Sequence, residues 1–154
     1  MRLNIVLRQM RDLRTELLLP PIIGEERLCV VRARYASQYN QTTIVTVEFA
    51  PLPEEAYVLD SRAPVSFDTR WLMRAAEDAA VHNAGIFLTH LHEHKGLPWF
   101  SPVDMQTNET ILHPMALIDQ TLPTGALLLS LDQAVALVAR SDGLIPIPVR
   151  EVPS

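Results

Sequence analysis

The stretch "GIFLTHLH", residues 85–92, is the part of the chain on which our prediction of the fold depends. It is a compact apolar run that directly follows a helical pattern, and such a run is typical of a strand in the interior of a sheet. The predicted helix begins after Asp68, which is a suitable N-cap, and ends near Asn83 and Gly85. Its apolar residues recur from Trp71 onward at spacings of one, three and four. These two elements predict a helix that leads into a buried strand.

The rest of the chain adds further elements on both sides of this pair. Alternating or β-branched runs predict strands over residues 2–9, 27–35, 42–50, 125–131, 134–139 and 144–152, and helical spacing predicts helices over 10–19 and within 101–120. The last strand is expected at a sheet edge, because Pro146 and Pro148 cannot donate hydrogen bonds to a ladder. Together these elements predict an α/β (α+β) fold in which helices flank a mixed β-sheet.

Composition indicates a single globular domain over residues 1–154. The chain has 48% apolar and 20% charged residues, which is ordinary for a protein with one hydrophobic core. The net charge of −5 and the lack of any basic cluster argue against nucleic acid as a partner. No run resembles a signal peptide or a membrane span, and the one cysteine, Cys29, cannot form an intrachain disulfide. We therefore expect a cytoplasmic protein without a membrane partner.

Three of the five histidines lie within five positions at the end of the buried strand. Residues two apart on a strand point to the same side, so His90 and His92 can present both imidazoles to one point. Asp104 follows twelve residues after His92, across a loop that contains Gly96 and Pro98, and can supply a third ligand. Two imidazoles, one carboxylate and a water form the open tetrahedral site of a catalytic zinc ion. The sequence therefore predicts one Zn²⁺ per chain.

These residues resemble the JAMM, or MPN-plus, family of zinc metalloproteases, also known as JAB-domain proteins. The family motif is a distant upstream glutamate, then His-x-His, then a serine and an aspartate three residues beyond it. Here the matching residues are His90-Leu91-His92 and Ser101-Pro102-Val103-Asp104, with the upstream part in "GEERLCVV" at 24–31. The resemblance implies that residues 1–154 form a single JAB/MPN metalloprotease domain with the cytidine-deaminase-like architecture of that family.

The chain departs from the family pattern at two places. The usual gap of seven residues between the second histidine and the serine is eight when counted from His92 and six when counted from His94. A one-residue loop insertion favours His90 and His92 as ligands, and the alternative pair is His92 with His94. The upstream glutamate is also ambiguous, because Glu25 and Glu26 are adjacent. The family tends to have a small residue three positions after the glutamate, and Cys29 occupies that position if the glutamate is Glu26. Glu26 is therefore preferred, and Glu25 is the alternative.

The resemblance also implies a role for each residue. Glu26 is the general base that takes a proton from water and passes it to the leaving amine. Ser101 donates a hydrogen bond to the oxyanion of the tetrahedral intermediate. Trp99 and Phe100, beside the serine, are either packing residues or a wall that binds an extended peptide tail of the substrate. Cys29 is expected to be a buried, unreactive thiol.

The expected function is a deubiquitinase-like isopeptidase or peptidase that uses zinc to hydrolyse the amide bond at the C-terminus of a ubiquitin-like protein. Bacterial or phage-encoded members of the family resemble such a short chain, and similar bacterial proteins accompany activating and conjugating enzymes in antiphage defence. The first alternative is a non-catalytic MPN-type scaffold that binds a partner protein. The second is a zinc hydrolase of small amides or cysteine adducts, which would favour a closed pocket over an open groove.

Overall fold

The computed structural model describes residues 1–22, 24, 26–38, 41–59 and 66–153. Within this part of the chain the strands are β1 (Arg2–Val6), β2 (Cys29–Gln38), β3 (Gln41–Pro51), β4 (Gly85–Leu91), β5 (Gly125–Leu129), β6 (Ala134–Arg140), β7 (Gly143–Ile147) and β8 (Val149–Val152). The helices are α1 (Leu7–Leu17), the 3-10 turn η1 (Glu54–Ala56), α2 (Thr69–Val81), α3 (Pro102–Thr107), the π-helical turn η2 (Asn108–Leu112) and α4 (His113–Ala116).

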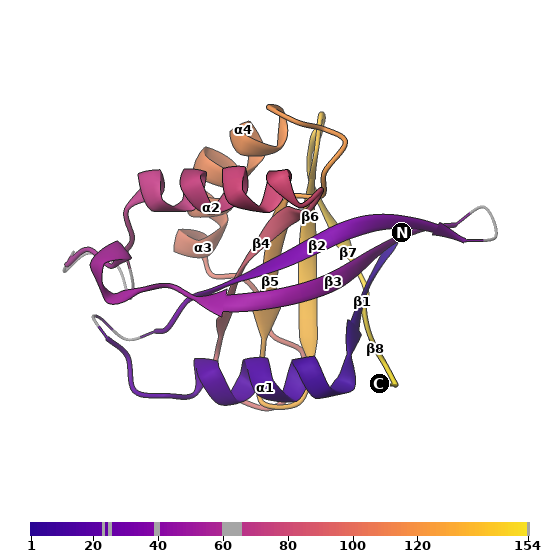
Figure 1. Ribbon diagram of the computed structural model, residues 1–154. Helices are drawn as coiled ribbons and strands as arrows, with labels where there is room; N and C mark the ends of the chain where they lie inside the picture. Colours follow the sequence, from indigo (N-terminus) through magenta and orange to yellow (C-terminus); the bar gives the residue numbers. More distant parts are fainter. Residues whose placement is uncertain (23, 25, 39–40, 60–65, 154) are drawn as a thin grey trace.

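All of these strands belong to one sheet, which almost closes into a barrel (Figure 1). The strand order is β7-β6-β5-β4-β2-β3-β1-β8, so β7 and β8 lie at opposite ends of the sheet. A single residue, Pro148, separates these two strands in the chain, and its carbonyl accepts a hydrogen bond from the N–H of Leu3 in β1 at 2.9 Å. Because one residue cannot cross an open sheet, the sheet must curve until its edges approach each other.

The predicted fold class is therefore wrong. We expected helices that flank a mixed sheet in the cytidine-deaminase-like architecture of the JAB/MPN family, whereas strands dominate the described chain and form an almost closed, barrel-like sheet. The segment 144–152 was predicted to be one edge strand, and it forms two strands on opposite edges. Pro148 cannot donate a hydrogen bond to the ladder, and it lies between the end of β7 and the start of β8. The crossing from one edge of the sheet to the other depends on tertiary structure, which local sequence patterns do not contain.

The two faces of the sheet bury separate apolar clusters. Helix α1 contributes Met10, Leu13 and Leu17 to the first cluster, and alternate residues of β4, such as Phe87 and Leu91, point toward it. Helix α2 and η2 cover the other face (Figure 1). There they pack on the intervening residues of β2 and β4, including Val30, Ile86 and Leu88, and on Leu28 directly before β2. The alternation of side chains along a strand produces this division.

Local boundaries differ slightly from the predicted ones. The first strand ends at Val6 and α1 starts at Leu7, so the alternating pattern over residues 2–9 extends into the helix. Asp68 is the N-cap of α2, because its carboxylate accepts a hydrogen bond from the backbone N–H of Arg70 at 2.9 Å. Among the described helices, none combines the length and the apolar character that a membrane crossing requires.

Candidate metal centre

Strand alternation directs two histidines to the face of the sheet covered by α2. Ile86 and Leu88 of β4 point toward this face, so His90 and His92 continue the same row. The backbone N–H of His92 donates to the carbonyl of Leu129 in β5 at 2.9 Å, which extends the ladder past the end of β4. As a result the two Nε2 atoms lie only 3.2 Å apart.

Glu26 reaches the same place from the segment that leads into β2. Strands β2 and β4 are antiparallel, with Val30 opposite Leu88. Continued along the chain, this register places residue 28 beside 90 and residue 26 beside 92. Glu26 shares the face of Leu28 and Val30 by the same alternation. The Glu26 Oε2 atom lies 3.9 Å from Nε2 of His90, and its Oε1 atom lies 3.7 Å from Nε2 of His92. Glu25 lies outside the described residues.

Asp104 comes from the first turn of α3. Ser101 and Asp104 form a capping box: the serine Oγ accepts from the N–H of Asp104 at 3.1 Å, and Asp104 Oδ2 accepts from the N–H of Ser101 at 2.8 Å. The same Oδ2 atom lies 3.2 Å from Nε2 of His90 and 3.6 Å from Nε2 of His92. The local role of these two residues as a helix cap therefore orients the carboxylate toward the imidazoles.

Glu26, His90, His92 and Asp104 form the metal-ligand cluster, in which one donor atom of each residue lies within 4.8 Å of the others. The cluster could hold a metal ion. In tetrahedral zinc sites, bonds of about 2.0–2.2 Å to N and O place neighbouring ligand atoms about 3.3–3.5 Å apart. The separations of 3.2, 3.2 and 3.6 Å among His90, His92 and Asp104 lie within about 0.1 Å of this spacing. The residues present therefore fit a zinc ion, with Glu26 slightly farther out.

Protonation states in the cluster also suit metal binding. Burial lowers the pKa of His92, and the neighbouring His90 lowers it further, against the opposing effect of Asp104. A neutral imidazole is the form that binds a metal. Burial alone would raise the pKa of Asp104, but its interactions with His90 and with Ser101 outweigh burial and lower it from 3.8 to about 2. The carboxylate is therefore ionised at neutral pH.

The other residues that the motif singled out lie around the cluster. The Ser101 hydroxyl accepts one hydrogen bond from Asp104 N–H, which leaves its own proton to donate. Phe100 packs against the core on the α2 side and lies edge-on to His90, with ring centroids 6.4 Å apart. Trp99 is 72% exposed and stacks against His94 at 5.5 Å. His94 does not belong to the metal-ligand cluster.

A polar turn between β5 and β6 supports the loop after His92, and sequence analysis missed it. Ser130 is fully buried, and its hydroxyl donates to the carbonyl of Gly96 at 2.6 Å. Asp132 accepts from the N–H of Gly96 at 2.8 Å, and Leu131 N–H donates to the His94 carbonyl at 2.9 Å. We call residues 130–133 the supporting turn. The visible signal was a serine and an aspartate directly after the apolar run of β5.

Helix α1 is linked to the supporting turn by one arginine. Arg14 Nε donates to the carbonyl of Ser130 at 3.1 Å, and its Nη2 donates to the carbonyl of Gln133 at 3.2 Å. Its remaining nitrogen contacts Glu151 of β8 at 3.3 Å. The loop beside the cluster is therefore tied through the turn to both α1 and the last strand.

Cys29 is not a second reactive centre. Its side chain is fully buried in the apolar core cluster on the α1 side of the sheet, away from the metal-ligand cluster. Burial, together with the nearby Glu16, raises the pKa of the thiol from 9.0 to about 12. A thiol that stays protonated at neutral pH is a poor nucleophile.

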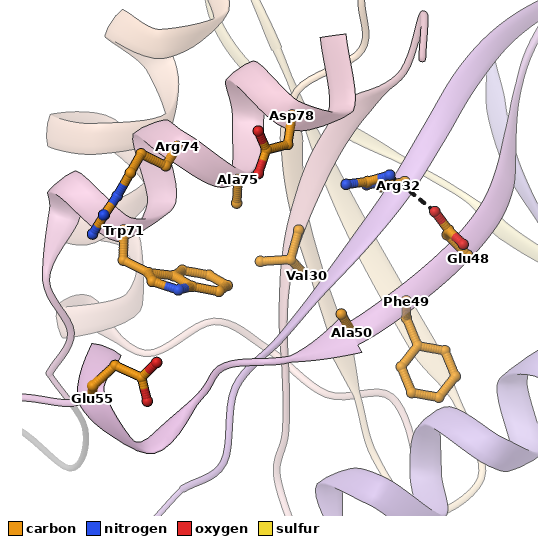
Figure 2. A pocket seen from close by; sticks show the side chains of 10 residues that line it. All are labelled: Val30, Arg32, Glu48, Phe49, Ala50, Glu55, Trp71, Arg74, Ala75 and Asp78. Carbon is orange, nitrogen blue, oxygen red and sulfur yellow. Dashed lines mark hydrogen bonds and ion pairs between the residues drawn. The ribbon is translucent and has the colours of Figure 1, made fainter. Parts of the chain in front are cut away.

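A larger cleft lies apart from the metal-ligand cluster, between α2 and the parts of β2 and β3 that face it (Figure 2). Its volume is about 550 Å³. Figure 2 shows the indole of Trp71 directed toward Val30, and the ion pair between Arg32 and Glu48, at 3.0 Å, on the other side of the cleft. None of the described residues that line this cleft is a cysteine or a histidine.

Comparisons with known proteins concern the fold alone. No protein-family model and no curated protein matches the chain. Among solved structures, the chain is similar to the solution structure of protein DSY2949 from Desulfitobacterium hafniense, with a TM-score of 0.56 over 99% of this chain and 94% of that chain. The two sequences are 14% identical. The likeness shows that the two proteins share a fold.

Proposed function

We propose that the protein is a zinc-dependent hydrolase of amide bonds, with the metal-ligand cluster as its active centre. The observation that carries this proposal is the spacing of three donor atoms, 3.2, 3.2 and 3.6 Å apart, from His90, His92 and Asp104. All three are oxygen or nitrogen ligands, and a set of three with an open position is typical of catalytic zinc. A zinc ion bound there would act as a Lewis acid and activate water at neutral pH.

The chain's own residues would carry the proton transfers. Glu26 lies 3.7 and 3.9 Å from the two imidazole nitrogens, close enough to reach a water bound at the centre, and its place in the motif assigns it the role of general base. It would take a proton from the attacking water as the new C–O bond forms, and give it to the nitrogen as the C–N bond breaks. Between these two steps, the proton of the Ser101 hydroxyl would hydrogen-bond to the oxyanion of the tetrahedral intermediate.

The motif formed by Glu26, His90, His92, Ser101 and Asp104 supports membership of the JAMM type of metalloprotease. This part of the proposal rests on the local motif and not on the architecture of the sheet. By that resemblance the substrate is a ubiquitin-like protein, cleaved at its C-terminal amide bond, and enzymes that activate or conjugate such a protein are the related partners. The exposed Trp99 beside the cluster suits an extended peptide tail better than a small enclosed substrate.

The test combines elemental analysis with a single isosteric variant. Purified protein should contain one zinc ion per chain, and Glu26→Gln should keep that zinc while losing at least about 100-fold in cleavage of a ubiquitin-like fusion protein. Glu77→Gln, on the exposed side of α2, is the matched control and should keep full activity. A protein without stoichiometric zinc would be a scaffold, and an active Glu26→Gln variant would remove Glu26 as the base.

A further inference from the structure

A narrow slot opens beside the metal-ligand cluster, and it contains a buried amide. Its volume is about 40 Å³, a few times the about 10–15 Å³ that one water needs on the same measure. Glu26, His90 and Asp104 line one part of the slot. The remaining walls are apolar except for two neutral polar residues, Thr107 and Asn108, and the apolar residues are Leu28, Phe67, Leu88, Val103 and Ala126.

Asn108 is the unusual member of this lining. Its side chain is buried, with 4% of the residue exposed. Among the described residues it makes one side-chain hydrogen bond, from Nδ2 to the sulfur of Met105 at 3.9 Å. A thioether is a weak acceptor, and buried amides normally have full partners for their donors and acceptor. Within the described part of the chain, Asn108 therefore keeps a free donor and a free acceptor where it lines the slot.

The backbone at Asn108 forms a π-helical turn, an irregularity that is typical of functional sites. The π-helical turn η2 begins at Asn108, and the N–H of His113 donates to the Asn108 carbonyl, five residues earlier. Such turns are rare, and they occur frequently at functional sites. Here the π-helical turn directly follows α3, the helix whose first turn carries Asp104.

We propose that this slot is a specificity subsite of the hydrolase and that Asn108 is its specificity-determining residue. The slot takes a small side chain with a hydroxyl or primary amide, that of serine, threonine or asparagine, on a substrate residue next to the scissile bond. A group with both a donor and an acceptor complements the free amide of Asn108. The carboxylates of Glu26 and Asp104 exclude anions, and the volume of about 40 Å³ excludes long side chains. This inference rests on the proposed function.

The experiment measures binding of a small probe to the protein in the presence of a chelator, so that no metal contributes. Acetamide carries a donor and an acceptor, whereas acetone has nearly the same shape and only an acceptor. We expect acetamide to give saturable NMR shifts at the Asn108 side-chain amide and at the backbone amides of Val103 and Ala126. Acetone should bind at least about tenfold more weakly, because it leaves the Asn108 carbonyl without a donor.

Three variants test the role of Asn108. Asn108→Leu should abolish the acetamide shifts at Val103 and Ala126, and Val103→Phe, at a partly exposed position, should narrow the slot and abolish them without changing Asn108. Met105→Leu removes only the weak sulfur acceptor and should leave them unchanged. Equal shifts with acetone, shifts that persist in Asn108→Leu, or no saturable shift because the slot holds water alone would each overturn the proposal. Zinc analysis of the same variants, purified without chelator, reports separately on the proposed function.

Discussion

The metal-ligand cluster and the cleft beside α2 differ in size and in the way their charged groups are arranged. The cleft has a volume of about 550 Å³, against about 40 Å³ for the slot beside the cluster. In the cleft, Arg32 is neutralised by Glu48, and the other charged groups extend from the exposed sides of α2 and η1 (Figure 2). In the cluster, four donor atoms lie within 4.8 Å of one another. Convergence of ligands, rather than volume, distinguishes the candidate site.

The elements that carry these groups explain the difference. The cluster draws Glu26 from the segment just before β2, His90 and His92 from the end of β4 and directly after it, and Asp104 from α3. The histidines are held by the ladder with β5, and the aspartate is held by a helix cap. Its two carboxylates and two imidazoles are thereby kept close together. The acids of the cleft lie on surfaces that water can solvate. Substitutions matched between the two regions can therefore test whether the arrangement has a function.

The largest contrast is expected between two aspartates. Asp104→Ala should reduce bound zinc from one ion per chain to almost none, because it removes the only ionised donor within 3.6 Å of both imidazoles among the described residues. Asp78→Ala, in the cleft, should leave the zinc content unchanged. Elemental analysis after gel filtration measures both. Equal zinc content in the two variants would mean that the metal does not bind at the cluster.

The next contrast separates the two roles of Ser101. Ser101→Ala should lower cleavage of the ubiquitin-like fusion by about 100- to 1,000-fold if the hydroxyl serves the oxyanion. Loss of the helix cap should also lower the unfolding free energy by about 1 kcal/mol. Asp68→Ala removes the N-cap of α2 and should lower Tm without affecting the rate. Thermal unfolding and kcat distinguish the two variants, and an unchanged kcat in Ser101→Ala would leave this serine as a cap alone.

A smaller effect is expected from the supporting turn. Ser130→Ala removes a buried hydroxyl that donates to Gly96 and accepts from the N–H of Gln133. The variant should lose about 1–3 kcal/mol of unfolding free energy in urea. It should also lose about tenfold in zinc affinity, measured by chelator competition, because the loop beside the cluster loses its support. Ser141→Ala, in the exposed turn after β6, is the control. A stable variant with unchanged affinity would show that the turn does not affect the site.

Much of the candidate site could be predicted from sequence, because its spacing is local. Residues two apart on a strand share a face, so the direction of His90 and His92 followed from the apolar run around them. The capping box also depends on a spacing of three residues. The approach of Glu26 depends on the register between β2 and β4, and the role of Ser130 depends on a contact 34 residues away, with Gly96. Spacing along the chain does not contain either of these.

The fold was harder to predict for a related reason. The apolar patterns located the strands well, since each strand needs only its own alternation. Closure of the sheet depends on which strands pair at the edges, and β1 pairs with both β3 and β8 in parallel. These partners lie about 40 and 146 residues along the chain from β1, as shown by Arg2 opposite Thr43 and Leu3 opposite Val149. The apolar pattern of residues 144–152 does not contain these distant pairings, so it predicted one edge strand where the structure has β7 and β8.

The smallest effect should come from the cleft's own ion pair. Arg32 and Glu48 lie 3.0 Å apart, but their side chains are 27% and 61% exposed. An exposed pair of this kind contributes less than about 1 kcal/mol, because water solvates both charges and salt screens them. Arg32→Ala should therefore change the unfolding free energy by less than that amount, and the difference should shrink as salt rises to 1 M. Zinc content and cleavage should stay at the level of the unmodified protein. A loss of cleavage in Arg32→Ala with zinc retained would instead make the cleft part of the substrate site. The two regions would then differ in role, because the cleft would bind the substrate and the metal-ligand cluster would carry out the reaction.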